Sequence, residues 1–299
     1  MKRLTALTLA LLVALGLSAC QKVDTDPVPD APVSAAPEGV ETPEEAFVTL
    51  TNDALEATKV KSVSATAIIT EGRVPEGEYD LPRSVVRQRE LVANGGIALL
   101  AEIPEKDAAF YGLEGKEFYP ALIRWGESLA EFDWQYMTPR CVEPRLWCFD
   151  YDGDGEDELA VDCYYGSGTG VSLSDLHVVE KNGDGTLTAY TFPTDVLSLA
   201  LDGYLTLVYA GNSLCGVLGT ELVDITGELE GERPGLEEIE LGIGSTLGFE
   251  RTEQGMECNI GTVLSGENMG YFHYVADITA DVLYKDGKFI LDGFHLDGY

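Results

Sequence analysis

The residues best suited to chemistry lie in one nine-residue stretch, 150–158, which reads DYDGDGEDE. Six of its nine side chains are carboxylates, and two glycines lie between them. Carboxylates packed this closely repel one another unless a cation joins them or water separates them. Hard oxygen ligands in a flexible loop favour Ca²⁺ over Mg²⁺, which keeps its waters, and over softer transition metals. We therefore predict a Ca²⁺ site; the alternative is an acidic surface turn without metal.

The stretch begins like an EF-hand loop but does not complete one. Asp150, Asp152 and Asp154 occupy positions one, three and five, and Gly155 occupies position six. Position twelve, which requires a bidentate acid, is Val161. A compressed ligand set fits instead, made of four carboxylates and one backbone carbonyl: the side chains of Asp150, Asp152, Asp154 and Glu158, and the carbonyl of Glu156.

Apolar runs flank the stretch at 146–149 and 159–161, and each predicts a strand where an EF-hand would have a helix. The sequence DYDGDGEDELAV resembles the calcium loop of FG-GAP or VCBS repeats, the modules of integrin α-type β-propellers, in which DxDxDGxxD joins two strands. The resemblance implies that Asp150, Asp152, Asp154 and Glu158 coordinate the metal, with Glu158 in place of the usual final Asp. We expect a structural role, tying two strands together, because an all-protein oxygen cage implies no activated water.

The N-terminus predicts export. Lys2 and Arg3 precede an apolar run, 4–17, that is too short for a spanning helix and is typical of a signal peptide, residues 1–19. The ending LSAC at 17–20 resembles the lipobox of bacterial lipoproteins, which implies cleavage before Cys20 and diacylglyceryl modification of its sulfur. The alternative is an ordinary cleaved signal followed by an incidental cysteine.

The mature chain is then expected at the extracytoplasmic face of the cell membrane, anchored there by the lipid on Cys20. Residues 20–42 contain four prolines and no hydrophobic periodicity, which predicts a semi-extended tether. Residues 43–299 are expected to form a β-rich domain with a possible boundary near 200. The lipobox, the tether and the single acidic loop together resemble uncharacterised surface lipoproteins of Gram-positive bacteria.

The charge balance excludes one class of partner. Without residues 1–19 the chain has 17 basic residues against 52 acidic ones, a formal charge of −35. Nucleic acid is therefore not an expected partner, since phosphate binding needs a basic face. An apolar content of 45% supports a folded core rather than acidic disorder. The charge favours solubility at a cell surface over an acidic docking face.

The hydrophobic pattern predicts a mainly β fold with one short N-terminal helix. Thr42 and Glu45 form a capping box with Pro43 at the first helical position, so a helix should run to about Thr58. Short apolar or alternating runs then recur every eight to twelve residues, which favours antiparallel meanders, propeller-like or sandwich-like. The predicted strands are 63–69, 97–103, 108–113, 121–125, 130–134, 146–149, 159–165, 176–180, 187–192, 204–209, 214–225, 239–243, 256–264 and 272–283.

Several local features refine this pattern. The runs within 97–134 and within 146–192 could each form a four-stranded sheet, and the NGDG sequence at 182–185 predicts a turn in the second. A short helix is expected at 194–201, closed by Gly203. Residues 282–284 and 289–291 predict a hairpin on the turn KDGK at 285–288.

The other candidate residues favour structural roles. Five cysteines follow Cys20, and their spacings match neither a zinc knuckle nor a CxxC pair. Cys141 and Cys148 could close a small loop, and the remaining three could be buried thiols in strands. The GSGTG sequence at 166–170 lacks a Walker lysine and predicts a hairpin connection. The three histidines, His177, His273 and His295, could supply a triad with Asp162 but are more typical of packed or exposed side chains.

Taken together, these patterns predict a lipid-anchored extracytoplasmic protein that binds a protein or carbohydrate ligand and holds one structural Ca²⁺. Aromatic residues near the C-terminus, from Tyr271 to Tyr299, could line a ligand face or fill the sheet core. A hydrolase acting on envelope or extracellular polymers with a pair of carboxylates is the enzymatic alternative. An accessory or sensor subunit is a third possibility.

Overall fold

The computed structural model describes residues 60, 62–75, 79–84, 96–113, 120–136, 142–229, 234–253, 255–266 and 273–299. The predicted signal peptide, lipidated Cys20, tether and N-terminal helix lie outside these residues, as does Cys141. The described chain is mainly β and its sheets are antiparallel except for one short pairing, so the predicted fold class is confirmed.

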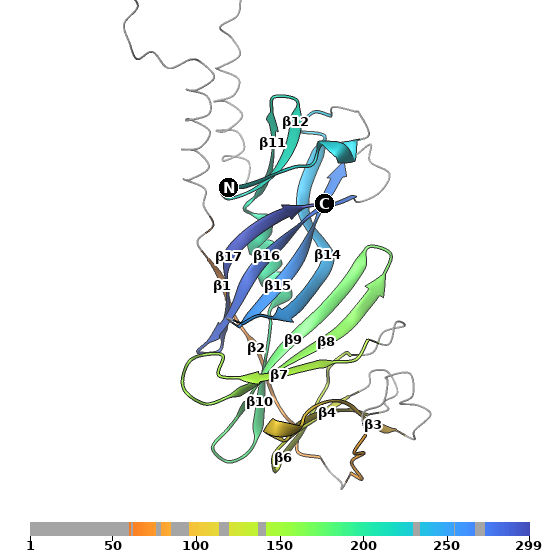
Figure 1. The fold of residues 1–299 in the computed structure, drawn as a ribbon, viewed down its shortest axis with the longest axis vertical. Coiled ribbons are helices and arrows are strands. Elements are labelled where there is room, and N and C mark those ends of the chain that lie inside the picture. Colours follow the sequence, from red (N-terminus) through yellow and green to blue (C-terminus); the bar gives the residue numbers. More distant parts are fainter. Residues whose placement is uncertain are drawn as a thin grey trace, which may run out of the picture. The chain divides into compact units, whose positions relative to one another are not determined.

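The largest unit is a ten-stranded sheet (Figure 1). Eight of its strands follow the order β1-β17-β16-β15-β14-β9-β10-β2; β7 and β8 extend from β9 on its other side. The single parallel pairing joins β14 to β9 over two residue pairs. The strands are β1 (Val63–Thr66), β2 (Ile68–Glu71), β7 (Arg145–Phe149), β8 (Glu158–Gly168), β9 (Val171–Lys181), β10 (Leu187–Thr191), β14 (Ile239–Arg251), β15 (Met256–Gly266), β16 (His273–Lys285) and β17 (Lys288–Gly298).

One segment supplies both ends of this strand order. The sequence predicts a single strand over 63–69, but the structure divides it at Ala67 because its two halves have different partners. β1 pairs with β17, and the Ala67 amide donates to the Gly287 carbonyl at 3.0 Å. β2 pairs with β10, and the Gly72 amide donates to the Leu187 carbonyl at 2.9 Å. Alternation in the sequence detects extended backbone and cannot show such a change of partner.

A separate four-stranded sheet contains β3 (Ile97–Ile103), β4 (Ala108–Leu113), β5 (Ala121–Trp125) and β6 (Ser128–Phe132) in sequence order, as predicted. The 3₁₀ turn η4 (Pro104–Lys106) joins β3 to β4. This sheet shares a buried core with β7, β8 and β9, to which Phe110, Ile123, Cys148, Leu159 and Val161 contribute. The four strands predicted within 146–192 also form and pair consecutively as β7, β8, β9 and β10, but β9 additionally pairs with β14, so they are part of the larger sheet.

A third sheet and one helix complete the described elements. The sheet contains β11 (Leu205–Ala210), β12 (Ser213–Leu218) and β13 (Glu221–Asp224), and η5 (Thr226–Leu229) follows it. The single strand predicted for 214–225 is wrong, because a turn with Gly219 at φ 59° separates β12 from β13. Helix α3 (Thr194–Asp202) confirms the helix predicted at 194–201 and buries Leu197 and Leu201 against the main core.

Two further predictions about turns and thiols can be compared with the structure. The β16–β17 hairpin is confirmed, and its turn residues Asp286 and Gly287 both have positive φ, as a two-residue hairpin turn requires. The four described cysteines, Cys148, Cys163, Cys215 and Cys258, are buried and free, which agrees with thiols packed in strands.

Candidate metal loop

The acidic stretch is a loop between two paired strands. Phe149 at the end of β7 and Glu158 at the start of β8 are register partners, so residues 150–157 leave the sheet and return to it side by side. Gly153 (φ 79°) and Gly155 (φ 95°) adopt the left-handed conformation that lets the backbone curl within this short span. A strand–loop–strand setting is therefore confirmed, as the sequence predicted.

Backbone amides inside the loop hydrogen-bond to its own carboxylates. Asp150 accepts from the amides of Gly153 at 2.7 Å and Gly155 at 3.0 Å. The Tyr151 amide donates to Glu158 Oε2 at 2.6 Å. Asp152 and Asp154 each accept from the amide two residues further on. These bonds fix the carboxylates in direction, but each donor is a neutral amide and leaves their charge uncompensated.

Three of these carboxylates converge. Oxygen atoms of Asp150, Asp152 and Glu158 all lie within 4.8 Å of one another, close enough to share one cation. Asp150 is exposed, Asp152 is half-buried and Glu158 is only 4% exposed, so the group leads from the surface to the base of the loop. Asp154, the fourth predicted side-chain ligand, is not in this group; its Oδ1 accepts from the Glu156 amide at 2.7 Å.

The pKa of Glu158 is shifted by its surroundings. Burial and the neighbouring carboxylates of Asp152, Asp154 and Asp150 raise its pKa to about 7, although the bond from the Tyr151 amide acts in the opposite direction. A carboxyl group in this setting is costly to ionise, and a cation shared with Asp150 and Asp152 would remove that cost. The electrostatics and the donor chemistry of the loop therefore both suit a divalent cation.

Two basic residues approach the loop from distant parts of the chain, and sequence reasoning missed both. Lys106 of η4 forms an ion pair with Asp157. Arg251, at the end of β14, lies over the Phe149 ring with its guanidinium carbon 4.9 Å from the centroid. Neither residue belongs to a sequence motif. Only the packing of the sheets places them beside residues 149–157.

The remaining sequence candidates lie in paired strands and in a hairpin connection. The GSGTG sequence lies at the β8–β9 hairpin, with Gly170 at φ 67°, which confirms a hairpin connection rather than a phosphate loop. Asp162, the candidate triad acid, accepts from Arg145 Nε at 2.7 Å. His177 stacks on Trp134 with ring centroids 4.0 Å apart, and burial lowers its pKa to about 3. These contacts are those of packed residues.

The two other histidines lie on β16 and β17. His273 Nδ1 is 3.9 Å from Glu228, and His295 is exposed on β17. Of the C-terminal aromatic residues, Tyr274 donates to the Gly170 carbonyl at 2.6 Å and Phe294 packs on the main core. Tyr271 and Phe272 lie outside the described residues.

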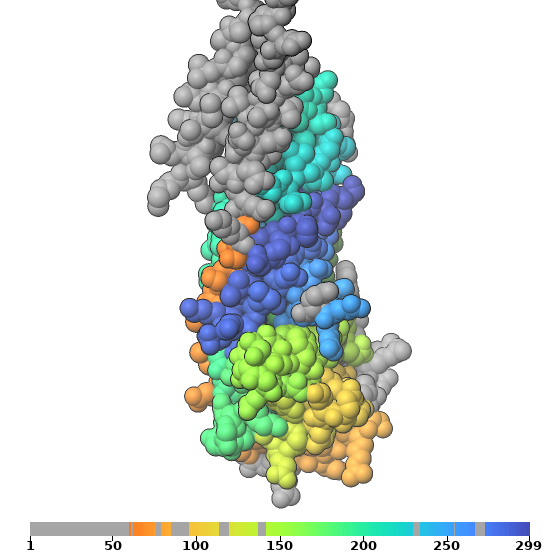
Figure 2. All heavy atoms as spheres, turned by 60° about the vertical axis from the view of Figure 1, so that its left-hand side comes forward, coloured from red at the N-terminus to blue at the C-terminus, as the bar shows by residue number. Residues whose placement is uncertain are grey.

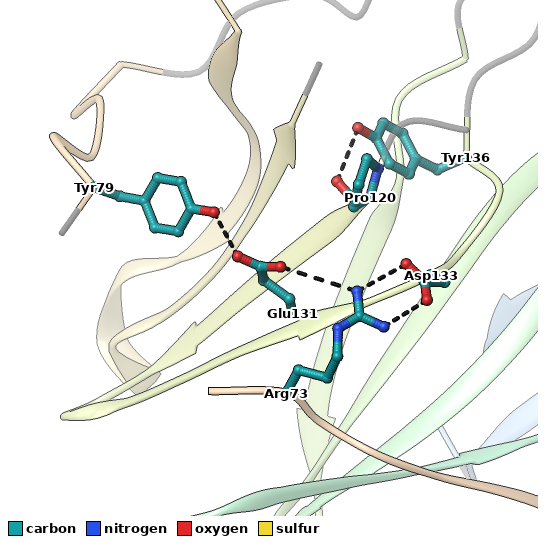
Figure 3. Close-up of polar contacts among 6 residues, drawn as sticks. All are labelled: Arg73, Tyr79, Pro120, Glu131, Asp133 and Tyr136. Atoms are coloured by element: carbon teal, nitrogen blue, oxygen red, sulfur yellow. Dashed lines mark hydrogen bonds and ion pairs between the residues drawn. The ribbon is translucent and has the colours of Figure 1, made fainter. Parts of the chain in front are cut away.

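A polar cluster joins Arg73 and Tyr79 to the end of β6 (Figure 3). Arg73 forms a bidentate ion pair with Asp133, with N–O distances of 2.5 and 2.8 Å, and lies 3.9 Å from Glu131. Tyr79 donates to the other Glu131 oxygen. These contacts fasten Arg73 and Tyr79 to the end of the four-stranded sheet. In a separate contact drawn in Figure 3, Tyr136 Oη donates to the carbonyl of Pro120 at 3.3 Å.

Comparison with protein families, with curated proteins and with solved structures gave no match to this chain. In the described part of the chain, no helix has both the length and the apolar character needed to cross a membrane.

Proposed function

We propose that this chain is a lipid-anchored extracytoplasmic binding or interaction protein whose β7–β8 loop holds a structural Ca²⁺. The observation that carries the calcium assignment is that carboxylate oxygens of Asp150, Asp152 and Glu158 lie within 4.8 Å of one another in the loop between two paired strands. The acidic sequence and its resemblance to FG-GAP or VCBS calcium loops agree with this geometry.

The loop suits Ca²⁺ in its donor atoms and in its backbone shape. Asp150, Asp152 and Glu158 offer carboxylate oxygens, the ligands that Ca²⁺ prefers, and no nitrogen or sulfur donor belongs to the converging group. The two positive-φ glycines let the backbone curl within a short span, and a loop of this irregular shape suits the coordination of Ca²⁺ better than the octahedral geometry that Mg²⁺ demands. Binding would neutralise Glu158 at the base of the loop and tie the ends of β7 and β8 together.

Thermal unfolding with Ca²⁺, with Mg²⁺ and with EDTA tests this assignment. We expect Ca²⁺ to raise the melting temperature of the wild type and Mg²⁺ to raise it less, because a ligand that binds only the folded state stabilises it. Asp152→Asn should abolish most of the shift. Asp184→Asn, which removes one carboxylate from a separate turn, is the matched control and should retain it. A wild-type melting curve that is the same in Ca²⁺ and EDTA would sink the assignment.

The lipid anchor is tested by the fate of Cys20. We expect the wild type to fractionate with membranes and into the detergent phase, since a diacylglyceryl group adds about 0.8 kcal/mol per buried methylene. Cys20→Ser should move the protein to the soluble fraction and leave the calcium response of the β domain unchanged. Membrane association that survives this substitution would contradict anchoring through Cys20.

A further inference from the structure

Lys106 occupies a defined place beside the acidic loop. Its ammonium forms an ion pair with Asp157, the residue directly before the proposed ligand Glu158. Among the described residues, it is the only salt bridge that involves one of the six loop carboxylates. Figure 2 shows the loop segment, in yellow-green, at the surface beside the yellow turn region that includes η4.

The turn that presents Lys106 is held independently of this ion pair. Asp107 adopts a left-handed conformation (φ 48°), and its amide donates to the Pro104 carbonyl at 3.1 Å. The Asp107 carbonyl accepts from the Gly126 amide at 2.8 Å, and its carboxylate pairs with Arg124. These bonds fasten η4 to β4 and β5, so the backbone of Lys106 has a fixed position.

The loop is held on the same structural unit from the other side. The four-stranded sheet packs on β7 and β8 through Phe110, Cys148 and Leu159, and these two strands define the ends of the loop. The lysine and the carboxylates are therefore neighbours because two sheets share a core. An exposed ion pair adds little to stability, yet the charge of a lysine whose backbone position is fixed acts on its surroundings whether or not the pair itself is strong.

We propose that Lys106 is a built-in counter-charge of the calcium loop: it offsets carboxylate repulsion in the metal-free protein and thereby weakens Ca²⁺ binding. This inference rests on the proposed calcium site. In a water-like dielectric, a unit positive charge on the order of one Debye length from a divalent cation opposes its binding by an amount that corresponds to about a three- to tenfold change in affinity. Because coupling between two sites is reciprocal, bound Ca²⁺ must weaken the ion pair between Lys106 and Asp157 by the same factor.

Calcium titration calorimetry on the full domain tests the first half of the proposal. We expect Lys106→Met to bind Ca²⁺ roughly three- to tenfold more tightly than the wild type at low ionic strength, with the gain shrinking in 0.5 M salt. Lys181→Met is the matched control: Lys181 stands over the Trp125 ring, with its Nζ 4.7 Å from the centroid, and its loss changes the net charge equally. Equal affinities for Lys106→Met and Lys181→Met would overturn the proposal while leaving the calcium site intact.

Amine labelling followed by mass spectrometry tests the second half. Because Ca²⁺ weakens the ion pair, we expect Lys106 in the wild type to react faster in Ca²⁺ than in EDTA, and Lys181 to react at the same rate in both. In Asp157→Asn, the response of Lys106 to Ca²⁺ should be smaller. A Lys106 rate that does not respond to Ca²⁺ in a protein that calorimetry shows to bind it would refute the coupling. A wild type that binds no Ca²⁺ refutes the site and the coupling together.

Discussion

Two hairpin connections of the same sheet use similar residues and reach opposite electrostatic outcomes. In the β9–β10 turn, Asp184 accepts from the Thr186 amide at 3.0 Å and hydroxyl at 2.7 Å, and Asn182 Nδ2 donates to the hydroxyls of Thr186 and Thr188. In the β7–β8 loop, the corresponding polar residues are further acids. In the first turn the single carboxylate accepts from both the hydroxyl and the amide of Thr186, whereas in the second the converging carboxylates of Asp150, Asp152 and Glu158 accept from backbone amides only.

The pKa values express the same difference. Hydrogen bonds from Thr186 lower the pKa of Asp184, whereas burial and neighbouring carboxylates raise that of Glu158 to about 7. In a turn of the first kind, hydrogen bonds from the turn itself stabilise the carboxylate, and no ligand is needed. A loop of the second kind gains from a partner of opposite charge, which is what a binding site for a cation requires.

The largest effect that would separate the two connections is expected for Glu158→Gln. The amide keeps an acceptor for the Tyr151 amide but loses the charge at the base of the loop, so Ca²⁺ affinity should fall at least about tenfold. In EDTA the variant should be as stable as the wild type or more so, because a neutral amide is cheaper to bury than a carboxylate. Calorimetry and thermal melting measure the two quantities. If this variant lost stability in EDTA and kept its affinity for Ca²⁺, the contrast drawn above would be wrong.

An intermediate effect is expected in the dependence of stability on pH without metal. Glu158 has a folded pKa near 7, above its usual 4.5, so the folded state binds more protons between these values and loses stability as pH rises through this window, by about 1–2 kcal/mol after allowance for screening. Asp175, with a pKa raised by burial to about 6, contributes in the same direction. His177 contributes oppositely, because its lowered pKa removes stability as pH falls from 6.5 towards 3.

Denaturant unfolding in EDTA at pH 5 and pH 8 isolates the part that belongs to Glu158. The loss of stability between these values should be smaller in Glu158→Gln than in the wild type, while Asp184→Asn should retain the full loss, since the lowered pKa of Asp184 acts below pH 5. Parallel pH profiles for all three proteins would show that Glu158 is not the group responsible.

The smallest effect is expected at the glycines, where the two connections are alike. Gly153 (φ 79°) and Gly185 (φ 84°) both adopt left-handed backbone, and an added Cβ meets no atom within 4 Å at the first and only Ser128 Oγ, at 3.7 Å, at the second. Alanine should therefore cost about 1 kcal/mol at either position through backbone strain alone. Urea unfolding of both variants in EDTA compares them; a cost several times larger at one turn would mean that its backbone does more than reverse the chain.

Much of the local structure could be predicted from the sequence. β3, β4 and β5 match their predicted limits, and the DG turn between β16 and β17 lies where its residues require. These features depend on neighbours in the chain: apolar runs bounded by turn residues, and glycine where φ is positive. The split of 63–69 into β1 and β2 and the joining of β14 to β9 depend instead on partners far away in sequence.

The candidate site divides in the same way. The loop and its flanking strands follow from spacing and residue type, and three of the carboxylates that the sequence singles out do converge. The burial of Glu158 and the presence of Lys106 do not, because both result from how the four-stranded sheet packs on β7 and β8. A pattern of acids can indicate where a cation would bind, but only tertiary packing determines which charges of the protein compete with it.

The position of β1 has a consequence for how the chain is completed during synthesis. Val63 pairs with Leu291 and Thr66 with Lys288, so the first described strand receives its partner only when the last hairpin has emerged. Pairings of such large sequence separation are slow to form, and until then both strands expose unpaired backbone. Deletion of the last ten residues should therefore destabilise the first described strand as well, because it removes two of the four residues that pair with β1.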